Sequence, residues 1–335
     1  MGGQDLDLRK IGEFGLLGRV RRWMKASDPS LIQGIGDDVA VFETGRKVFL
    51  ATTDILIEGV HFERTWIDPY HLGKKALAVN LSDIAAMGGT PRYFLLSLGL
   101  PKDLAFSFVS RFYRGLKEMA KQFGVNLIGG DTSLSQKVII NICLLGEGEK
   151  RKLLYRKGSN VGDDLFVTGT LGDSALGLRM LRRKDLRAKS EGLIARHLSP
   201  MPRIDLGKAI ARQRLATAMI DVSDGLLIDT NHLLEESGKG VRIREDWIPL
   251  SKLYRKYVSS YSKDYFQMAL SGGEDYELLF TAQPKMRGKI SSLALNYKIP
   301  VTRIGEILPS RKGIRIVRKD GTEYFPTHLG FDHFK

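Results

Sequence analysis

The sequence predicts an α/β or α+β protein in which helices and sheets form two or more layers. Segments with the apolar composition of strands alternate with segments of helical spacing along both halves of the chain. Both halves also share a rhythm of strand, acidic turn with Gly or Ser, and helix. At 335 residues the chain is long for a single core, so we expect two domains.

The first half begins with helical spacing of apolar residues at 13–24. Residues 47–54 are predicted as a strand that ends in the carboxylate of Asp54. Pro69 suits the first turn of a helix after Asp68, and the glycine pair at 88–89 closes that helix. The other predicted elements of this half are a strand at 92–101, a long amphipathic helix that ends on Gly124, a short strand at 125–133 that runs into a Gly-Gly-Asp turn, and a strand at 137–148.

A polar segment with few apolar residues, 147–162, is the candidate boundary and predicts domains at 1–149 and 150–335. After it, residues 163–181 are predicted as a strand, a Gly-rich turn and a helix with Asp173 or Ser174 as the N-cap. The remaining predicted elements are a strand, loop and helix at 217–238, a loop and strand at 271–282, and strands at 303–309 and 314–319.

The chain is basic, with 52 Lys and Arg against 38 Asp and Glu and a formal net charge of +14. This excess allows nucleic acid, an anionic membrane or phosphorylated small molecules as partners. Much of it lies between Lys150 and Arg214, and the run RMLRRKDLRAK (179–189) is predicted to form the solvated face of a helix and its following loop. No aromatic residues are interleaved with these basic ones, so the sequence predicts no nucleic-acid partner.

Cysteine usage and hydropathy predict a cytoplasmic protein. The single cysteine, Cys143, excludes an internal disulfide and a Cys-rich metal site, and it lies in an apolar run predicted to be a buried strand. No window holds ~18 consecutive apolar residues, so no transmembrane helix is expected. The amino terminus, MGGQDLDLRK, lacks the apolar core of a signal peptide.

Acidic residues recur where apolar runs meet short polar turns. The stretch QGIGDDVAVF holds Asp37 and Asp38, a pair that alone would indicate only a turn. Five other segments place acids at comparable junctions: Asp54, Asp83, Asp131, Asp221 with Asp224, and Glu274 with Asp275. Most are flanked by Gly, Ser, Thr or Asn and follow apolar runs, neither of which a surface acid requires. We therefore predict that the acids share one site.

The composition of this set favours magnesium and a phosphate-rich ligand. The chain has 6 His and no Cys beside the acids, which disfavours zinc or copper, and the EF-hand spacing of calcium sites is absent. Because Mg²⁺ usually takes one or two carboxylates and completes its shell with water and phosphates, many acids imply several ions. No P-loop motif is present. Arg156, in LLYRKGS, is a candidate phosphate contact or, alternatively, a solvated surface charge.

Several motifs together resemble the thiamine-monophosphate kinase family. They are GIGDDVAVF, TTDILIEGVHF, KALAVNLSDIAAMGG, IGGDTS, VTGTLGDSALGL, RHLSPMPRI, IDVSDGL, ALSGGEDYELLF and a terminal GFDHF. The family belongs to a superfamily with aminoimidazole ribonucleotide synthetase, selenophosphate synthetase and hydrogenase-maturation carbamoyl dehydratases. The resemblance implies transfer of the γ-phosphoryl group of ATP to thiamine monophosphate, which gives thiamine diphosphate and ADP.

The resemblance also implies an architecture and a set of site residues. Strands of the N-terminal domain would pair across a homodimer into a barrel, and the active site would lie in the cleft before a C-terminal α/β domain. The implied Mg²⁺ ligands are Asp38, Thr52, Thr53, Asp54, Asp83, Asp131, Asp221 and Asp224. The implied ATP-binding residues are Tyr113, Gly130, Asp131, Arg156 and Ser223. The implied substrate-binding residues are His61, Glu274 and Phe331, the last at a position where the family more often has Trp or Tyr.

The implied chemistry needs no catalytic side chain that forms a covalent bond or takes a proton. The attacking group is a phosphate oxygen that is largely ionised at pH 7, since its second pKa is ~6. Two other classes stay open: another ATP-using enzyme of the superfamily, such as an aminoimidazole ribonucleotide synthetase, and a basic nucleic-acid-binding protein. Structural roles also stay open for His61 as a packed histidine, Tyr113 as a core or interface ring, and Asp224 as a helix N-cap.

Overall fold

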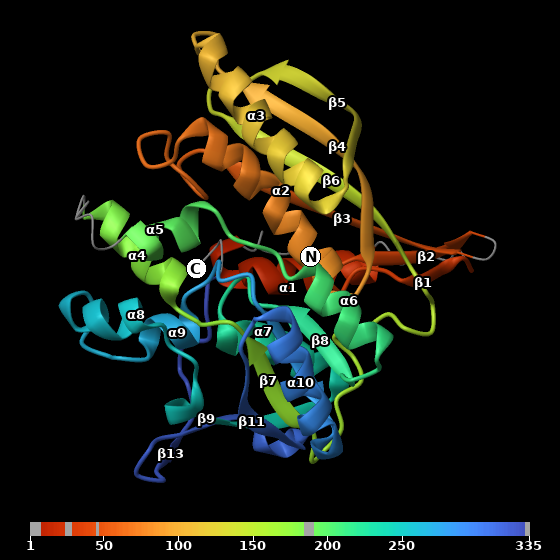
Figure 1. The fold of residues 1–335 in the computed structure, drawn as a ribbon, viewed down its shortest axis with the longest axis vertical. Coiled ribbons are helices and arrows are strands. Elements are labelled where there is room, and N and C mark those ends of the chain that lie inside the picture. The colour runs from red at the N-terminus through yellow and green to blue at the C-terminus, as the bar shows by residue number, and fades with distance from the viewer. Residues whose placement is uncertain (1–7, 24–28, 45–46, 184–190, 332–335) are drawn as a thin grey trace, which may run out of the picture.

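The computed structural model describes residues 8–23, 29–44, 47–183 and 191–331, which are arranged around two sheets (Figure 1). In these ranges the N-terminal sheet has six strands in the order β1-β2-β3-β6-β4-β5. Its strands are β1 (Leu31–Gln33), β2 (Ala40–Thr44), β3 (Lys47–Ile57), β4 (Thr90–Leu100), β5 (Asn126–Leu134) and β6 (Ile139–Gly148). Neighbours pair antiparallel except β4 and β5, which are parallel. Strand β5 is last in this order and is therefore an edge strand of the sheet.

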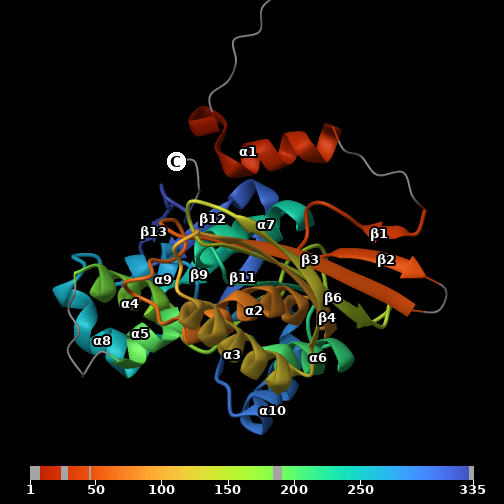
Figure 2. The ribbon, with the colours of Figure 1, turned by 90° about the horizontal axis from the view of Figure 1, so that it is seen from above.

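Two of the predicted helix ends in this half are confirmed. Helix α2 (Pro69–Ala86) has Asp68 as its N-cap, whose carboxylate accepts the N–H of Tyr70 at 2.8 Å. Helix α3 (Phe106–Phe123) ends at Gly124, whose φ of 65° needs a residue without a β-carbon. Helix α1 (Leu8–Trp23) lies on the outside of the molecule (Figure 2), and the predicted helix at 13–24 is confirmed as far as the described residues reach.

Two strand predictions in this half are wrong in detail. Strand β3 does not end at Asp54, because the next three residues continue the pairing with β6 as far as Ile57 opposite Ile139. The Gly-Gly-Asp sequence is not a turn but lies inside β5. A β-carbon on Gly130 would lie 1.8 Å from the carbonyl oxygen of Leu96, so glycine here lets β4 and β5 approach each other.

The C-terminal sheet has seven strands within the described residues, in the order β13-β12-β9-β11-β7-β10-β8. Its strands are β7 (Asp164–Thr168), β8 (Ala218–Asp221), β9 (Lys239–Arg244), β10 (Leu278–Ala282), β11 (Val301–Pro309), β12 (Ile314–Val317) and β13 (Glu323–Tyr324). Only β9 and β12 pair in parallel. The α/β class is confirmed, and the barrel across a dimer stays a prediction.

The helices of this half are α4 (Asp173–Arg182), α5 (Glu191–Leu198), α6 (Ile204–Arg212), α7 (Leu226–Ser237), α8 (Lys252–Tyr257), α9 (Gln267–Ser271) and α10 (Arg287–Tyr297). The predicted N-cap of α4 is wrong. The cap residue is Gly172 with a φ of 81°, and the carboxylate of Asp275 accepts the N–H groups of Gly172 at 2.7 Å and Ser174 at 3.3 Å. Asp173 instead accepts the hydroxyl of Ser251 at 2.6 Å.

One buried core connects the two sheets. The buried side chains of the N-terminal sheet and of α2 belong to the same cluster as Phe166 and Phe280, whose rings stack at 5.4 Å on one face of the C-terminal sheet. A second cluster covers the other face of that sheet, with Leu176 of α4 and Leu227 of α7. Helix α2 therefore lies at the junction of the two halves (Figure 1), while the predicted division at residues 149 and 150 stays a prediction.

The basic run at 179–189 does more than form a solvated surface. The guanidinium of Arg182 lies 5.9 Å from the ring centre of Trp66, and that of Arg183 lies 5.0 Å from the ring centre of Tyr261. Arg179 donates to the carbonyl oxygen of Tyr261 at 2.8 Å. Residues 184–189 of the run lie outside the described ranges. Among the helices that the structure describes, none is long and apolar enough to cross a membrane.

Candidate active site

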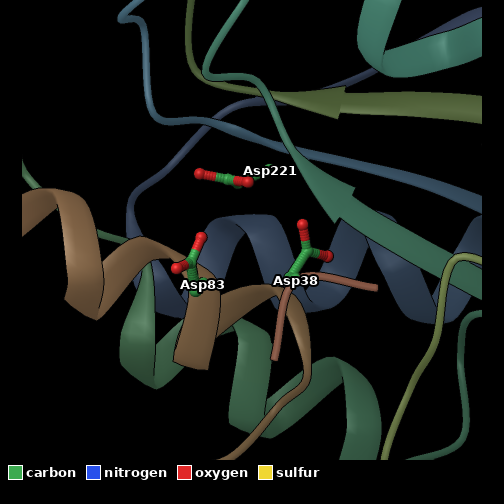
Figure 3. A group of neighbouring side chains, drawn as sticks. All are labelled: Asp38, Asp83 and Asp221. Atoms are coloured by element: carbon green, nitrogen blue, oxygen red, sulfur yellow. The ribbon is translucent and has the colours of Figure 1, made fainter. Parts of the chain in front are cut away.

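Three carboxylates from distant segments converge where the two sheets meet. Asp38 precedes β2, Asp83 lies on α2, and Asp221 ends β8 (Figure 3). One oxygen of each lies within 4.8 Å of the other two. Asp38 and Asp221 are buried and Asp83 is half-buried. Like charges this close repel one another, and a divalent cation would relieve the repulsion.

Asp54 and Asp224 extend this group, because charge interactions that shift pKa values connect them to the three carboxylates. Burial, followed by the charges of Asp224 and Asp38, raises the pKa of Asp54 to about 6. Burial and the charges of Asp54, Asp221 and Asp38 raise the pKa of Asp83 well above its ordinary value. Burial and then the charge of Asp38 raise the pKa of Asp221 to about 8. We call Asp38, Asp54, Asp83, Asp221 and Asp224 the acid cluster.

Helix α2 holds the acid cluster through its polar side chains. The hydroxyl of Thr52 on β3 donates to the carboxylate of Asp83. Ser82 donates to Asp221 at 2.6 Å, which connects α2 to the C-terminal sheet. Asn80 accepts the N–H of Asp54 at 3.1 Å, which connects α2 to β3. Because these contacts come from one buried helix, the acids are fixed relative to one another.

The donor set of the acid cluster fits a hard cation. Arg156 donates to Oδ1 of Asp38 with Nη2 at 2.6 Å and Nε at 3.2 Å. The other oxygen, Oδ2 of Asp38, is buried and has no hydrogen-bond partner among the described residues. Buried polar atoms normally have a partner, so this oxygen is suited to a ligand. The side-chain atoms of this site that could bind a metal are carboxylate and hydroxyl oxygens, the ligands that Mg²⁺ prefers.

Asp37, the neighbour of Asp38, supports the backbone. Its carboxylate accepts the N–H of Asp38 at 3.0 Å and that of Arg156 at 3.2 Å. Burial and then the charge of Asp38 raise the pKa of Asp37 to about 7. These contacts agree with the turn that the Asp37–Asp38 pair alone indicated.

The cap role left open for Asp224 is wrong. Helix α7 begins after Gly225, and Asp229 accepts the N–H groups of Asp224 at 3.1 Å and Gly225 at 3.0 Å. Ser223 lies in the same turn, where its carbonyl oxygen accepts the N–H of Glu274 at 2.6 Å. The turn at 222–225 therefore connects the acid cluster with the loop that carries Glu274.

The structure does not bring four of the predicted site residues to the acid cluster. Thr53 points to the opposite face of β3 from Thr52 and donates to the carbonyl of Ile142 at 3.0 Å. Gly130 and Asp131 lie on β5, three strand spacings or about 14 Å across the sheet from β3, at ~4.8 Å per strand. Tyr113, 37% exposed on α3, packs edge-on against Phe112.

The substrate-binding residues predicted around Glu274 do lie together with the acid cluster. Oε2 of Glu274 lies 2.8 Å from Nζ of Lys75 and 2.8 Å from Nδ1 of His197. Burial alone would raise the pKa of Glu274, but the charges of Lys75 and His197 hold that pKa well below its ordinary value. Phe331, 49% exposed, donates its N–H to the carbonyl of Asp224 at 3.2 Å.

His61 is placed by a local contact. Its Nδ1 accepts the N–H of Ile57 at 3.1 Å, which closes the turn after β3. This bond fits the packed-histidine alternative that the sequence left open.

Tyr276 is a site residue that the sequence analysis missed. It is buried, and after burial the charges of Glu274, Asp54, Asp221 and Asp224 raise the pKa of its hydroxyl well above the ordinary value. The charges of both Glu274 and the acid cluster therefore act on this hydroxyl. Glu274 and Tyr276 both have positive φ, 66° and 49°, a strained backbone that the surrounding loop enforces.

Lys75 and His197 were also missed. Lys75 is only 1% exposed, which is unusual for a charged side chain. Its spacing was a usable signal, because residues seven and eight positions later, Ser82 and Asp83, share its helix face. His197 lies within RHLSPMPRI, a motif that carried the resemblance but no residue assignment. The buried carboxylate of Glu277 forms ion pairs with Arg196 at 2.7 Å and with Arg203 at 2.5 Å. No pattern in the sequence predicted these ion pairs.

Comparisons with known proteins identify the family. The model of the AIR synthase related protein, N-terminal domain, matches residues 36–147, and that of the C-terminal domain matches residues 160–318. A curated thiamine-monophosphate kinase from Aquifex aeolicus is 40% identical over 329 residues, which cover 98% of this chain and 99% of that protein. The chain belongs to the thiamine-monophosphate kinase family. The resemblance seen in the sequence is thus confirmed, and the chain is an enzyme of that kinase family.

Other members of the thiamine-monophosphate kinase family agree. The Escherichia coli thiamine-monophosphate kinase is 38% identical over 327 residues, 96% of this chain and 98% of that protein. A solved structure named "AaThiL complexed with AMPPCP and TMP" matches with a TM-score of 0.86 at 39% identity and covers 99% of this chain and 100% of that one. The two-sheet fold is therefore that of a thiamine-monophosphate kinase.

Proposed function

We propose that this protein transfers the γ-phosphoryl group of ATP to thiamine monophosphate, forming thiamine diphosphate and ADP. The observation that carries the proposal is the acid cluster, with its unpartnered Asp38 oxygen, beside the charged Glu274 pair. A phosphate-rich site and a site for a cationic ring are thereby adjacent. The relative that is named with both AMPPCP and TMP supports the pairing of a nucleotide with the phosphorylated substrate.

The residues that would hold Mg²⁺ are the acid cluster and Thr52. Bound Mg²⁺ would neutralise charge on the phosphates of both substrates and so lower their mutual repulsion. The acids act as holders of charge and not as proton carriers. The predicted metal roles of Thr53 and Asp131 are not part of this set, because their side chains lie on other parts of the sheet.

Arg156 is the cation of this chain nearest to the phosphates in the proposal. In the described structure its guanidinium donates to the carboxylate of Asp38, and its backbone N–H donates to the carboxylate of Asp37. A guanidinium in this place can donate to two phosphate oxygens at once. It would therefore orient the nucleotide against the acid cluster, in agreement with the ATP-binding role and not with a solvated surface charge. Ser223 keeps its predicted ATP-binding place in the adjacent turn.

Glu274 and Phe331 suit the thiamine substrate, whose thiazolium ring carries a positive charge. The contacts with Lys75 and His197 keep Glu274 ionised, and an ionised carboxylate attracts such a ring. Phe331 is half exposed and its backbone N–H bonds to Asp224 of the acid cluster, so in the proposal its ring stacks on the same cation. His61 remains a proposed contact of the thiamine substrate.

The transfer requires alignment more than proton transfer. The attacking phosphate oxygen is already ionised at pH 7, since its second pKa is ~6. The fixed acids, Arg156 and Glu274 would hold attacking and leaving oxygens in line. The deciding test incubates the protein with ATP, Mg²⁺ and thiamine monophosphate and measures thiamine diphosphate. Turnover of formylglycinamidine ribonucleotide in its place would favour the aminoimidazole ribonucleotide synthetase alternative.

We also propose that the protein is a homodimer through the N-terminal sheet. Strand β5 is an exposed edge, and the sheet carries exposed apolar side chains on β3, β4 and β5: Ile55, Tyr93, Leu95, Leu127 and Ile128. Exposed edges and apolar patches of this kind favour association. Gly130, Asp131 and Tyr113 would then act at or near this interface. A mass of one chain by light scattering would contradict the dimer.

A further inference from the structure

A cavity lies apart from the acid cluster, between the end of β6, the connecting segment after it (residues 149–153) and helix α6. Its volume is about 750 Å³, within the range of ~300–1,000 Å³ that small-molecule sites occupy. None of the residues that line it belongs to the acid cluster or to the Glu274 pair. The proposed kinase chemistry therefore leaves this cavity without a role.

The cavity gathers part of the basic excess noted between Lys150 and Arg214. Its basic lining residues are Lys150, Arg151, Lys152, Lys208 and Arg212. Its acidic lining residues are Glu147, Glu149 and Asp205. The cations come from two separate elements, the connecting segment and α6, so folding brings them to one cavity.

Ion pairs remove most of the negative charge of the lining. Lys152 lies 2.7 Å from Glu149, and Arg92, outside the lining, lies 2.5 Å from Glu147. Arg151, Lys208 and Arg212 make no ion pair with any residue that the structure describes. Three cations therefore face one remaining acid, Asp205, and the cavity has a surplus of positive charge.

The arrangement of these cations suits a diphosphate. Lys208 and Arg212 are four residues apart on α6, which places their side chains on one helix face about 6 Å apart. Arg151 extends from the connecting segment. Arginine forks bind phosphate oxygens in pairs, and lysine adds a point charge. Tyr297, 39% exposed at the end of α10, adds a flat ring to the lining.

We propose that this cavity binds a small molecule with a diphosphate group and a heterocyclic ring. The diphosphate lies against Lys208, Arg212 and Arg151, and the ring lies against Tyr297. This site goes beyond the proposed function, since it needs neither metal nor the acid cluster. Two sources share the chemistry, a nucleoside diphosphate and thiamine diphosphate.

The test uses inorganic pyrophosphate as the probe, in EDTA, with binding measured by titration calorimetry. Without metal the acid cluster repels the probe, so binding reports the cavity. The variant K208A/R212A should bind at least about tenfold more weakly, since it loses charge-assisted hydrogen bonds to the phosphate oxygens. The control K252A/K319A removes the same charge from exposed positions outside the cavity and should bind as the unchanged protein does. No binding by the unchanged protein, or equal weakening in both variants, would overturn the proposal.

Two further arms distinguish the source of the ligand. ADP and thiamine diphosphate are titrated in the same buffer. The compound that carries the ring of the true ligand should bind more tightly than pyrophosphate. Tyr297→Leu should abolish that gain and leave pyrophosphate binding unchanged; equal weakening of pyrophosphate would contradict the ring contact. K208A/R212A should keep full turnover of ATP with thiamine monophosphate. Failure of this site and failure of the kinase proposal are thereby distinguishable.

Discussion

Nζ of Lys75 lies 2.8 Å from Oε2 of Glu274, and this contact joins helix α2 to the loop before β10. The two residues are 199 positions apart in the chain. The lysine is 1% exposed, and a charge at that depth requires a partner. The pair therefore fixes the loop that carries Glu274 and Tyr276 to the helix that carries Asp83.

Removal of the lysine should destabilise the protein. In Lys75→Met the carboxylate of Glu274 loses its closest cation while it remains largely buried, so we expect a loss of about 3 kcal/mol in the free energy of unfolding. Denaturant titration measures it. Lys74→Met is the matched control, because the neighbouring Lys74 pairs with Glu118 at the surface and its loss should be much smaller. Equal losses in the two variants would show that the buried pair has no special role.

The acid cluster should make the metal-free protein less stable as pH rises. The pKa of Asp54 is raised to about 6 and that of Asp221 to about 8, so both hold protons that the unfolded chain has released above about pH 4. Their contribution favours folding at low pH and is lost as pH rises through 6 and then 8. In EDTA, the Tm should therefore fall between pH 5 and pH 8.

Magnesium should reverse that loss, since it binds the ionised acids. The rise in Tm on addition of Mg²⁺ should be larger at pH 8 than at pH 6, as measured by calorimetry. A Tm that is independent of Mg²⁺ at pH 8 would mean that the acid cluster holds no cation.

Arg156 should affect the nucleotide more than the thiamine substrate. Arg156→Ala removes a fork that can contact two phosphate oxygens, and we expect the KM for ATP to rise by about tenfold or more. The KM for thiamine monophosphate should change less. Lys157→Ala, an exposed cation next in the chain, should leave both values unchanged. The reverse pattern would place Arg156 on the other substrate.

Glu274 should determine affinity for the thiamine substrate. Glu274→Gln keeps the size of the side chain but removes the charge that attracts the thiazolium ring. We expect the KM for thiamine monophosphate to rise by about tenfold, with a smaller change for ATP. Steady-state kinetics with each substrate varied in turn provides the test. A larger effect on ATP would reassign Glu274 to the nucleotide.

Two helix ends were predicted correctly from local signals in the sequence. Asp68 and Pro69 predicted the start of α2, and Gly124 predicted the end of α3, because caps and turns depend on adjacent residues. Asp38 and Asp221 were predicted together because both lie at the ends of apolar runs, and the structure places their carboxylates in one group.

Strand order and register were not available from the sequence. Asp131 has the same local motif as the other acids, but β5 lies at the far edge of the sheet, and only long-range pairing determines that. Thr52 and Thr53 could not be distinguished until pairing placed Thr52 toward Asp83 and Thr53 toward Ile142. The contacts of Glu274 with Lys75 and His197 join segments too distant for any spacing rule.

The most direct test of the account measures thiamine diphosphate formation by Asp83→Asn over a range of Mg²⁺ concentrations. Asp83 accepts from Thr52 and adjoins Asp38 and Asp221, so loss of its charge should weaken every cation in the acid cluster. We predict a fall in kcat/KM of at least about 100-fold with an unchanged fold by circular dichroism, while the exposed control Asp320→Asn keeps full activity. Near-normal turnover of Asp83→Asn with an ordinary Mg²⁺ dependence would contradict the central claim that the acid cluster holds the metal for phosphoryl transfer.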